Sequence, residues 1–285
     1  MARRSFDGRT VLVTGAGGGL GRATAALFAA AGARIAALDR DADGVEQLRL
    51  DLEARGSECL ALTGDVTDAA GCADAVDRAV DRFGSLDVLV NNAGMSHRSS
   101  FASTGIGVIH RIMEVNFFGA VYCTKAALPH LRASRGLIVA ISSVAGFAPL
   151  IARTGYSASK HAMHGFFTSL RTELEPDGVD VMLVCPSFIA THIDRNALGG
   201  DGAPVRHAQV TVGRPLGAES AAARILAGAE RGRRLVLIGR TAHAAWWVTR
   251  VAPAFYERLM ARRLRGELES DDERAGMGSG QEPSR

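Results

Sequence analysis

The stretch TGYSASKHAM, residues 154–163, contains the two side chains whose spacing most clearly suggests chemistry. Tyr156 and Lys160 are four residues apart, so on a helix they lie on one face, one turn apart. An unperturbed tyrosine has a pKa of about 10 and is a poor acid–base group at neutral pH. A nearby ammonium favours the phenolate and lowers that pKa. The spacing therefore predicts a tyrosine made more acidic by a neighbouring lysine.

The choice of lysine at position 160 is itself informative. The chain has 33 lysines plus arginines, and only Lys125 and Lys160 are lysines. An ammonium is a compact point charge that can donate to a ribose hydroxyl, whereas a planar guanidinium imposes a different fork geometry. We therefore expect Lys160 to serve a site, although a solvated helix residue is the simpler interpretation of this motif in isolation.

A glycine-rich segment, VTGAGGGLG at residues 13–21, lies between an apolar run and an alanine-rich helical stretch. Glycines there let the backbone approach a pyrophosphate, which would bind at the helix N-terminus. The spacing departs from GxGxxG, because Leu20 occupies the last glycine position counted from Gly15. A plain strand-to-helix turn is the alternative. We predict that this segment binds a nucleotide through Thr14, Gly15, Gly17, Gly18, Gly19, Leu20 and Gly21.

Acidic residues follow the next two apolar runs. Asp39 can accept hydrogen bonds from adenosine ribose hydroxyls and repel a 2′-phosphate, or it can cap the following helix. Arg40 would instead attract that phosphate, but Gly18 adds no positive charge to the loop, so the balance favours NAD over NADP. Asp65 and Val66 end the third run, near where an adenine would lie, although Asp65 can also cap a turn.

These motifs sit on a regular alternation of elements. Seven apolar runs alternate with helical spacing, at residues 10–15, 33–39, 59–65, 86–94, 136–143, 179–187 and 234–239. Helices are expected over about 20–31, through Val45, Leu48 and Leu52, over 68–84, through Ile109, Met113 and Phe117, and around Tyr156. We predict an α/β fold, a doubly wound, Rossmann-like, seven-stranded parallel sheet with helices on both faces. Ligands bind at the carboxyl ends of such strands, where the polar motifs lie.

The composition excludes several classes of protein. The chain has 285 residues, 47% hydrophobic and 22% charged, with a net charge of +3 from scattered arginines, so no nucleic-acid partner is expected. Cys59, Cys72, Cys123 and Cys185 are far apart and lack metal-ligand spacing, which favours reduced core cysteines and no metal. No apolar run reaches the roughly 18 residues of a membrane span, and we expect a cytoplasmic protein.

Taken together, the motifs resemble those of the classical short-chain dehydrogenases/reductases (SDR) over about residues 8–240. That family's pattern runs TGxxxGxG, NNAG, a helix asparagine, a serine, YxxxK and PGxxxT. This chain reads TGAGGGLG, NNAG at 91–94, VNFFG with Asn116, Ser143, YSASK and PSFIAT at 186–191. One departure is Ser187, where the family usually has glycine.

The resemblance implies an oxidoreductase with a nicotinamide cofactor. In it, Tyr156 would be the catalytic acid or base, and Lys160 would lower its pKa and hold the nicotinamide ribose. Ser143 would bind the substrate oxygen, and Asn116 would support a water-linked proton path. Thr191 would contact the nicotinamide carboxamide. Further cofactor contacts are expected from Asn92, Ala93, Gly94, Pro186, Ser187 and Ile189.

Two later regions interrupt the alternation of strands and helices. We expect residues 1–240 to form the dinucleotide-binding and catalytic domain, including a substrate loop over about 192–217 that is rich in glycine and proline. Residues 241–269 are expected to form an amphipathic helical extension, with Val248, Val251, Phe255 and Leu259 at helical spacing and arginines between them. This extension would be a lid, a subunit interface or a weak membrane-surface contact. Residues 270–285 are expected to be a disordered tail.

The leading hypothesis is hydride transfer between NAD and an apolar secondary alcohol or ketone, steroid-like or otherwise lipophilic, in a homodimer or homotetramer. An NADPH-dependent 3-oxoacyl reductase is the alternative within the class. A non-catalytic dinucleotide sensor or scaffold is the alternative from another class, and the full set Asn116, Ser143, Tyr156 and Lys160 argues against it. His97 and His192 follow cofactor motifs and would face either substrate or solvent.

Overall fold

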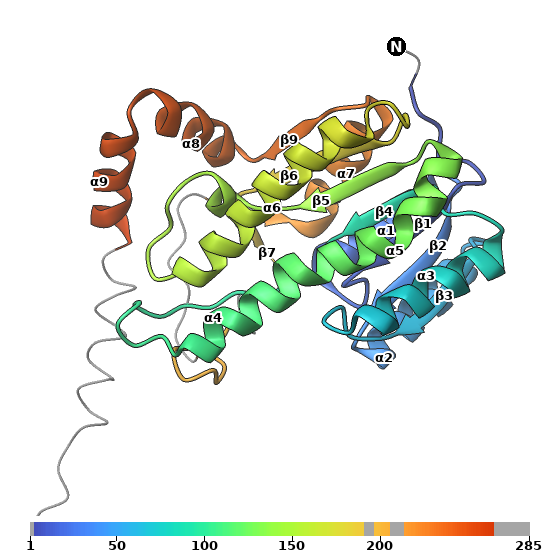
Figure 1. Ribbon diagram of the computed structural model, residues 1–285, viewed down its shortest axis with the longest axis horizontal. Coiled ribbons are helices and arrows are strands. Elements are labelled where there is room, and N and C mark those ends of the chain that lie inside the picture. The colour runs from blue at the N-terminus through green and yellow to red at the C-terminus, as the bar shows by residue number, and fades with distance from the viewer. Residues whose placement is uncertain (1–2, 191–196, 206–213, 265–285) are drawn as a thin grey trace, which may run out of the picture.

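The computed structural model describes residues 3–190, 197–205 and 214–264. Seven strands form one parallel sheet in the order β3-β2-β1-β4-β5-β6-β9, which confirms the predicted doubly wound architecture (Figure 1). Their bounds are β1 Thr10–Thr14, β2 Arg34–Asp39, β3 Cys59–Thr63, β4 Val88–Asn91, β5 Leu137–Ile141, β6 Asp180–Pro186 and β9 Leu235–Ile238. A separate two-stranded pair joins β7 Ile189–Ala190 to β8 Leu216–Gly217.

Strict alternation of side chains along the strands builds a core on each face of the sheet. On β1, Val11 and Val13 face one core, whereas Leu12 faces the other. The first core is covered by α1 Gly19–Ala30, α2 Ala42–Glu53 and α7 Ala218–Glu230. The second is covered by α3 Ala69–Phe83, α5 Gly119–Ser134 and α6 Thr154–Leu174. Both faces are therefore buried, which is why these strands read as continuous apolar runs.

Local chemistry sets where the early helices begin. Asp41 caps α2 by accepting a hydrogen bond from the Gly44 amide at 3.1 Å, and Asp68 caps α3 through the Ala70 amide at 3.0 Å. The alternative in which Asp39 caps α2 is therefore wrong, because the N-cap residue is Asp41, two residues after Asp39. β3 ends at Thr63, opposite Asp39, where β2 also ends. The expectation that Asp65 and Val66 end this strand is therefore wrong, because both lie in the loop that follows it.

The strand order reverses between β1 and β4, which creates the crevice that binds ligands in such folds. β1 pairs with both neighbours, Val11 lying opposite Ile35 of β2 and Val88 of β4. The chain leaves β1 toward β2 and leaves β4 toward β5, on opposite sides. The loops that follow β1 and β4 therefore meet at this point without a crossing connection.

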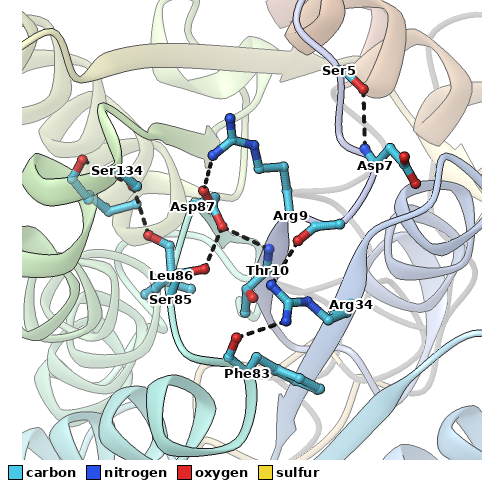
Figure 2. A network of polar contacts seen from close by, with 12 residues as sticks. Ser5, Asp7, Arg9, Thr10, Arg34, Phe83, Ser85, Leu86, Asp87 and Ser134 are labelled. Carbon is cyan, nitrogen blue, oxygen red and sulfur yellow. Dashed lines mark hydrogen bonds and ion pairs between the residues drawn. The ribbon is translucent and has the colours of Figure 1, made fainter.

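A polar network ties β1 to β4 at the opposite, amino-terminal edge of the sheet (Figure 2). The Asp87 carboxylate accepts hydrogen bonds from Arg9 at 2.6 Å, from the Thr10 amide at 3.0 Å and from the Ser85 hydroxyl at 2.9 Å. Because these contacts fix both strands at their starts, they also fix the spacing of the loops at their far ends.

A single long helical run precedes β5. It begins with α4 Ile106–Met113, widens into the π-helical turn η1 Glu114–Phe118 and continues as α5. The sequence predicted a helix through Met113 and Phe117 but not the π-helical turn, which holds Asn116. Such turns occur frequently at functional sites.

The expected C-terminal extension consists of two helices, α8 Arg240–Val251 and α9 Pro253–Arg263. The helix breaks at Ala252, which has a φ of −142° and precedes the proline that starts α9. Both helices project to one side of the sheet (Figure 1). Among the described helices, none is both long and apolar enough to cross a membrane. The tail predicted to be disordered, residues 270–285, lies outside the described residues.

Candidate active site

A cavity of about 920 Å³ opens at the carboxyl ends of the strands. Its walls include Ser143, Tyr156 and Lys160, together with most of the residues predicted to bind the dinucleotide. Those cofactor residues are Gly15, Gly17, Gly18, Gly19, Leu20, Asp39, Arg40, Asp65, Val66, Asn92, Ala93, Gly94, Pro186, Ser187 and Ile189. Thr14, Gly21 and Asn116 are buried and do not line the cavity themselves. Thr191 and His192 lie outside the described residues.

The loops after β1 and β4 are locked together by Thr14 and Asn92. The Thr14 hydroxyl accepts hydrogen bonds from the Asn92 and Ala93 amides, each at 3.0 Å. The Asn92 amide group in turn donates to the carbonyls of Thr14 at 2.9 Å and Gly15 at 3.1 Å. These contacts give the NNAG segment a role beyond a tight turn, because they hold the glycine loop against it.

At two glycines of the loop, neighbouring backbone atoms lie so close that a side chain would not fit. Gly15 has a φ of +66°, and a Cβ there would lie 2.9 Å from the Ala93 Cα. A Cβ on Gly21 would lie only 1.9 Å from the Gly15 carbonyl oxygen. The first helix can therefore start directly beneath the loop.

The N-terminus of α1 has the properties of an anion site. No side chain caps it, and no acidic residue lies in its first turn. Its backbone amides and the positive end of the helix dipole therefore face the cavity without a competing carboxylate. These features fit the pyrophosphate of a dinucleotide.

Asp39 sits between the glycine loop and α2. Its carboxylate accepts hydrogen bonds from the Gly17 amide at 2.9 Å and from the Asp41 amide at 3.1 Å. Each oxygen thus has one protein donor and keeps acceptor capacity toward the cavity. Asp65, by contrast, accepts from the Thr67 amide and hydroxyl, both at 2.9 Å, so it caps a turn as the sequence alternative allowed.

Lys160 is buried beneath Tyr156 on α6. Only 4% of the lysine is exposed, and its Nζ lies 5.8 Å from the centroid of the Tyr156 ring. Nζ donates a hydrogen bond to the Ile141 carbonyl at the end of β5, at 2.9 Å. Burial lowers the pKa of Lys160 from 10.5 to about 8, so the ammonium form still predominates at neutral pH. The interpretation as a solvated helix residue is wrong.

The two serines at the end of β5 have different partners. The Ser142 hydroxyl donates to the Lys160 carbonyl at 3.2 Å and so joins β5 to α6. The Ser143 oxygen accepts from the Ala145 amide at 3.1 Å and caps the short helix η2 Val144–Gly146. Because Ser143 accepts this bond, its hydroxyl proton can be directed into the cavity. Ser143 can therefore cap this short helix and also present a donor to the cavity.

Asn116 joins three segments around the site. Its Oδ1 accepts from the Met95 amide at 2.8 Å, and its Nδ2 donates to the Met95 carbonyl and to the Ser159 hydroxyl, both at 2.9 Å. A Cβ on Gly94 would lie 3.2 Å from Oδ1 and 3.7 Å from the Lys160 Nζ, so the final glycine of NNAG permits this close packing. Both amide hydrogens are used within the protein.

The loop after β6 accommodates its unusual serine. The Ser187 amide donates to the Ile238 carbonyl at 2.9 Å. Its hydroxyl oxygen occupies space that a side chain at residue 239 would need, since a Cβ on Gly239 would lie 2.3 Å from it. Gly239 also has a φ of +101°, which favours glycine. The Ser187 side chain therefore fits because residue 239 is a glycine.

The C-terminal extension, for which the sequence left a lid as one of three alternatives, forms the outer wall of the cavity. Residues of α8 and α9 line it, namely Thr241, Ala244, Ala245, Val248, Phe255, Tyr256, Leu259, Met260 and Arg263. These helices pack on a separate cluster that contains Ala148, Leu150 and Ile151. The helical spacing showed an apolar face, but only the packing shows that this face covers the cavity. Arg153, 1% exposed, also lines it and was not singled out.

His97 is neither solvated nor a lining residue of this cavity, so both expectations for it were wrong. It is fully buried beside Gly155, and burial lowers its pKa to about 4, with a further contribution from Arg153. Within the described residues neither ring nitrogen has a hydrogen-bond partner. His97 is therefore a neutral packing residue.

The arrangement places an anion-binding helix terminus, two hydroxyls and a buried ammonium around one cavity. Hydroxyls at this position can polarise a carbonyl oxygen, and the ammonium can stabilise negative charge on the neighbouring phenol. Such a site suits proton transfer to or from an oxygen atom while a bound dinucleotide lies along the glycine loop.

Comparisons with known proteins agree with this geometry. The family model described as short chain dehydrogenase matches residues 9–200. Dehydrogenase/reductase SDR family member 7B of Bos taurus is 37% identical over 268 residues, covering 91% of this chain and 82% of that protein. Dehydrogenase/reductase SDR family protein 7-like of Anopheles gambiae is 38% identical over 267 residues, covering 91% and 84% respectively.

A solved structure provides a further comparison. A short chain dehydrogenase/reductase SDR from Burkholderia phymatum, crystallised in complex with NAD, matches with a TM-score of 0.76 and 27% sequence identity. The match covers 86% of this chain and 92% of that one. The likeness therefore extends over the sheet and its surrounding helices.

Proposed function

The chain belongs to the short chain dehydrogenase family, and on that premise we propose that it transfers a hydride between NAD and an apolar secondary alcohol or the corresponding ketone. The observation that carries the proposal is the meeting of Ser143, Tyr156 and buried Lys160 on the wall that also contains the glycine loop. A site with only structural functions has no need for a buried ammonium beside a phenol.

In the reduction direction, a nicotinamide bound along the glycine loop would supply a hydride to the carbonyl carbon of the substrate. Ser143 and Tyr156 hold the carbonyl oxygen through their hydroxyls, and Tyr156 gives its proton to that oxygen as charge develops there. In oxidation, Tyr156 removes the hydroxyl proton. Lys160 would stabilise the resulting phenolate, and its ammonium would donate to the ribose of a bound nicotinamide nucleotide.

We assign Asn116 a positioning role. Its side chain holds the Met95 backbone and the Ser159 hydroxyl, so it fixes the distance between the NNAG loop and the helix that holds Tyr156. Because its amide hydrogens are already donated within the protein, a water-linked proton path through Asn116 would have to use its backbone.

The preference for NAD over NADP rests on Asp39. Its carboxylate lies between the glycine loop and α2, where the adenosine ribose would bind, and a 2′-phosphate there would meet a negative charge. Of the nearby arginines, Arg22 is paired with Asp51, whereas Arg40 is the one feature that favours NADP. The Burkholderia phymatum relative described with NAD supports the same choice.

An apolar substrate is supported by the outer wall of the cavity. Beyond Ser143, the lining includes the apolar side chains of Val144, Ala148, Leu150, Val248, Leu259 and Met260, together with the polar residues Arg153, Thr241 and Arg263. A steroid-like or other lipophilic ketone would bury its surface against these side chains. The same cavity of about 920 Å³ includes most of the residues expected to hold the whole dinucleotide, so cofactor and substrate would share it, with the substrate against this apolar wall.

The Tyr156→Phe variant tests the mechanism. A panel of hydrophobic secondary alcohols is assayed with NAD by following NADH absorbance, and NADH binding is measured by titration. We expect Tyr156→Phe to lose turnover by roughly 10³-fold while its NADH dissociation constant stays within about threefold, because only the ionisable hydroxyl is removed. Tyr122→Phe, away from the cavity lining, should retain wild-type rates.

Unchanged turnover in Tyr156→Phe would refute the proposed acid–base role. The cofactor assignment is tested separately with Asp39→Asn, which keeps an acceptor oxygen but removes the charge. We expect NADPH binding to improve relative to NADH by about tenfold, since one like-charge repulsion is removed. Tighter binding of NADPH than of NADH to the wild-type protein would overturn the assignment.

A further inference from the structure

The outer faces of α8 and α9 expose an unusual concentration of large apolar side chains. Among the described residues seven such side chains are exposed, and three of them lie within nine positions here. Trp247 is 65% exposed, Val251 80% and Phe255 60%. The inner faces already pack on the body of the protein through Ala245, Tyr256 and Met260, so folding does not account for the outer ones.

On α8, positive and apolar groups share this outer face. Five exposed residues of α8 lie within one narrow stripe, because their spacing is i, i+3, i+7, i+10 and i+11. They are Arg240, His243, Trp247, Arg250 and Val251. The helix has no aspartate or glutamate. The stripe therefore combines an indole, an aliphatic side chain and two guanidinium groups with no acidic neighbour on the helix.

On α9, the stripe continues with Phe255, Arg258 and Arg262 at i, i+3 and i+7, again all exposed. Glu257 is the single acidic residue of this helix. Residues 240–264 thus hold five arginines and one carboxylate, in a chain whose total net charge is only +3. The positive charge of this region is local and coincides with the exposed apolar side chains.

We propose that this face of α8 and α9 docks the protein onto an anionic membrane surface. Tryptophan, phenylalanine and valine would enter the boundary between headgroups and acyl chains, and the arginines would bind lipid phosphates. A second copy of the chain fits the face poorly, because two-fold pairing would bring the same arginines against one another.

The face also borders the mouth of the cavity. Phe255 and Arg263 are both exposed and line the cavity, so one rim of its opening belongs to the proposed membrane contact. If the proposed function holds, a lipophilic ketone dissolved in the bilayer would pass from the acyl chains into the cavity along α9 without crossing water. The docking itself does not depend on the enzyme's activity.

Docking is tested by flotation of the full-length protein with vesicles. We expect binding to phosphatidylcholine vesicles that contain about 30% phosphatidylglycerol and little binding to pure phosphatidylcholine, with loss at high salt. Replacing Trp247, Val251 and Phe255 with serine should lower the partition coefficient by about 1,000-fold, at roughly tenfold for each side chain withdrawn from the bilayer. Arg258→Gln combined with Arg262→Gln should lower it by about fivefold per arginine.

Leu50→Ser provides a matched control, because Leu50 is 48% exposed on α2, away from this face. Its partition coefficient should equal that of the wild type. In a Trp246→Phe variant, Trp247 is the only tryptophan left. Brominated acyl chains should then quench its fluorescence, which locates the contact at this residue.

The proposal is overturned if the wild type fails to float with anionic vesicles, or if the serine variant floats equally well. It is also overturned if light scattering shows that the serine substitutions dissociate an oligomer, since the face would then be a subunit interface. Failure of the proposed function has a different signature, namely vesicle binding without turnover of any alcohol.

Discussion

Replacing Lys160 with methionine should make the protein more stable and less active. Methionine has nearly the same shape but no charge. A pKa of about 8 in place of 10.5 means that folding disfavours the ammonium by about 3 kcal/mol. The variant loses the hydrogen bond to the Ile141 carbonyl, which costs about 1 kcal/mol. The expected gain is about 2 kcal/mol in the free energy of unfolding near pH 6.5, without dinucleotide.

The sign of the pH dependence follows from proton binding. Between about pH 8 and 10.5 the unfolded lysine keeps its proton while the folded one has lost it, so the wild type gains stability as pH rises through this range. Below pH 8 both states are protonated and the penalty is complete. The advantage of Lys160→Met should therefore be full at pH 6.5 and clearly smaller at pH 9.5.

Urea unfolding at these two pH values measures the effect, and kinetics at neutral pH measure the loss of activity. We expect kcat/KM to fall by roughly 10²-fold or more, because the phenolate of Tyr156 loses the stabilising positive charge of Lys160. Lys125→Met is the matched control, since this other lysine is exposed on α5 and should change stability by less than about 0.5 kcal/mol. The reasoning is refuted if Lys160→Met destabilises the protein at pH 6.5, or if its advantage is the same at pH 9.5.

Two further substitutions test the two ends of the sheet. Gly21→Ala should abolish measurable NADH binding and lower the melting temperature, because its Cβ would lie 1.9 Å from the Gly15 carbonyl oxygen. Gly18→Ala is the control, and it should leave the melting temperature unchanged because no atom lies within 4 Å of its Cβ. Equal melting temperatures for the two variants would contradict this account of the loop. Asp87→Ala should cost about 3 kcal/mol in unfolding free energy by removing three hydrogen bonds, with little change in KM for NAD. A large rise in that KM, with stability unchanged, would argue against a purely structural role for this network.

The elements that carry the motifs could be predicted because their signals are local. Each strand is an apolar run that is buried on both faces. The glycine or hydroxyl residue that serves the site directly follows its strand in the sequence. The helix that bears Tyr156 and Lys160 was predictable for the same reason, since a spacing of four residues determines that they share a face. The seven strands and their parallel order accordingly agree with the structure.

Pairing between distant segments was not predictable in this way. Asp41, and not Asp39, caps α2, because the exact start of a helix depends on where its neighbouring strand stops pairing. His97 follows a polar motif yet is fully buried, because Gly155 of the distant helix α6 packs beside its ring. The residues next to His97 in the sequence do not show whether its side chain is buried or exposed.

By itself the sequence determined the sheet, the glycine loop and the tyrosine–lysine pair, since strand and helix periods and the chemistry of single residues are local properties. Only the tertiary structure decided that α8 and α9 close the cavity, that Asn116 holds the Met95 backbone against α6, and that Lys160 is buried. Burial and its electrostatic consequences arise when segments far apart in the chain exclude water from the same space. That exclusion lowers the pKa of Lys160 beneath Tyr156.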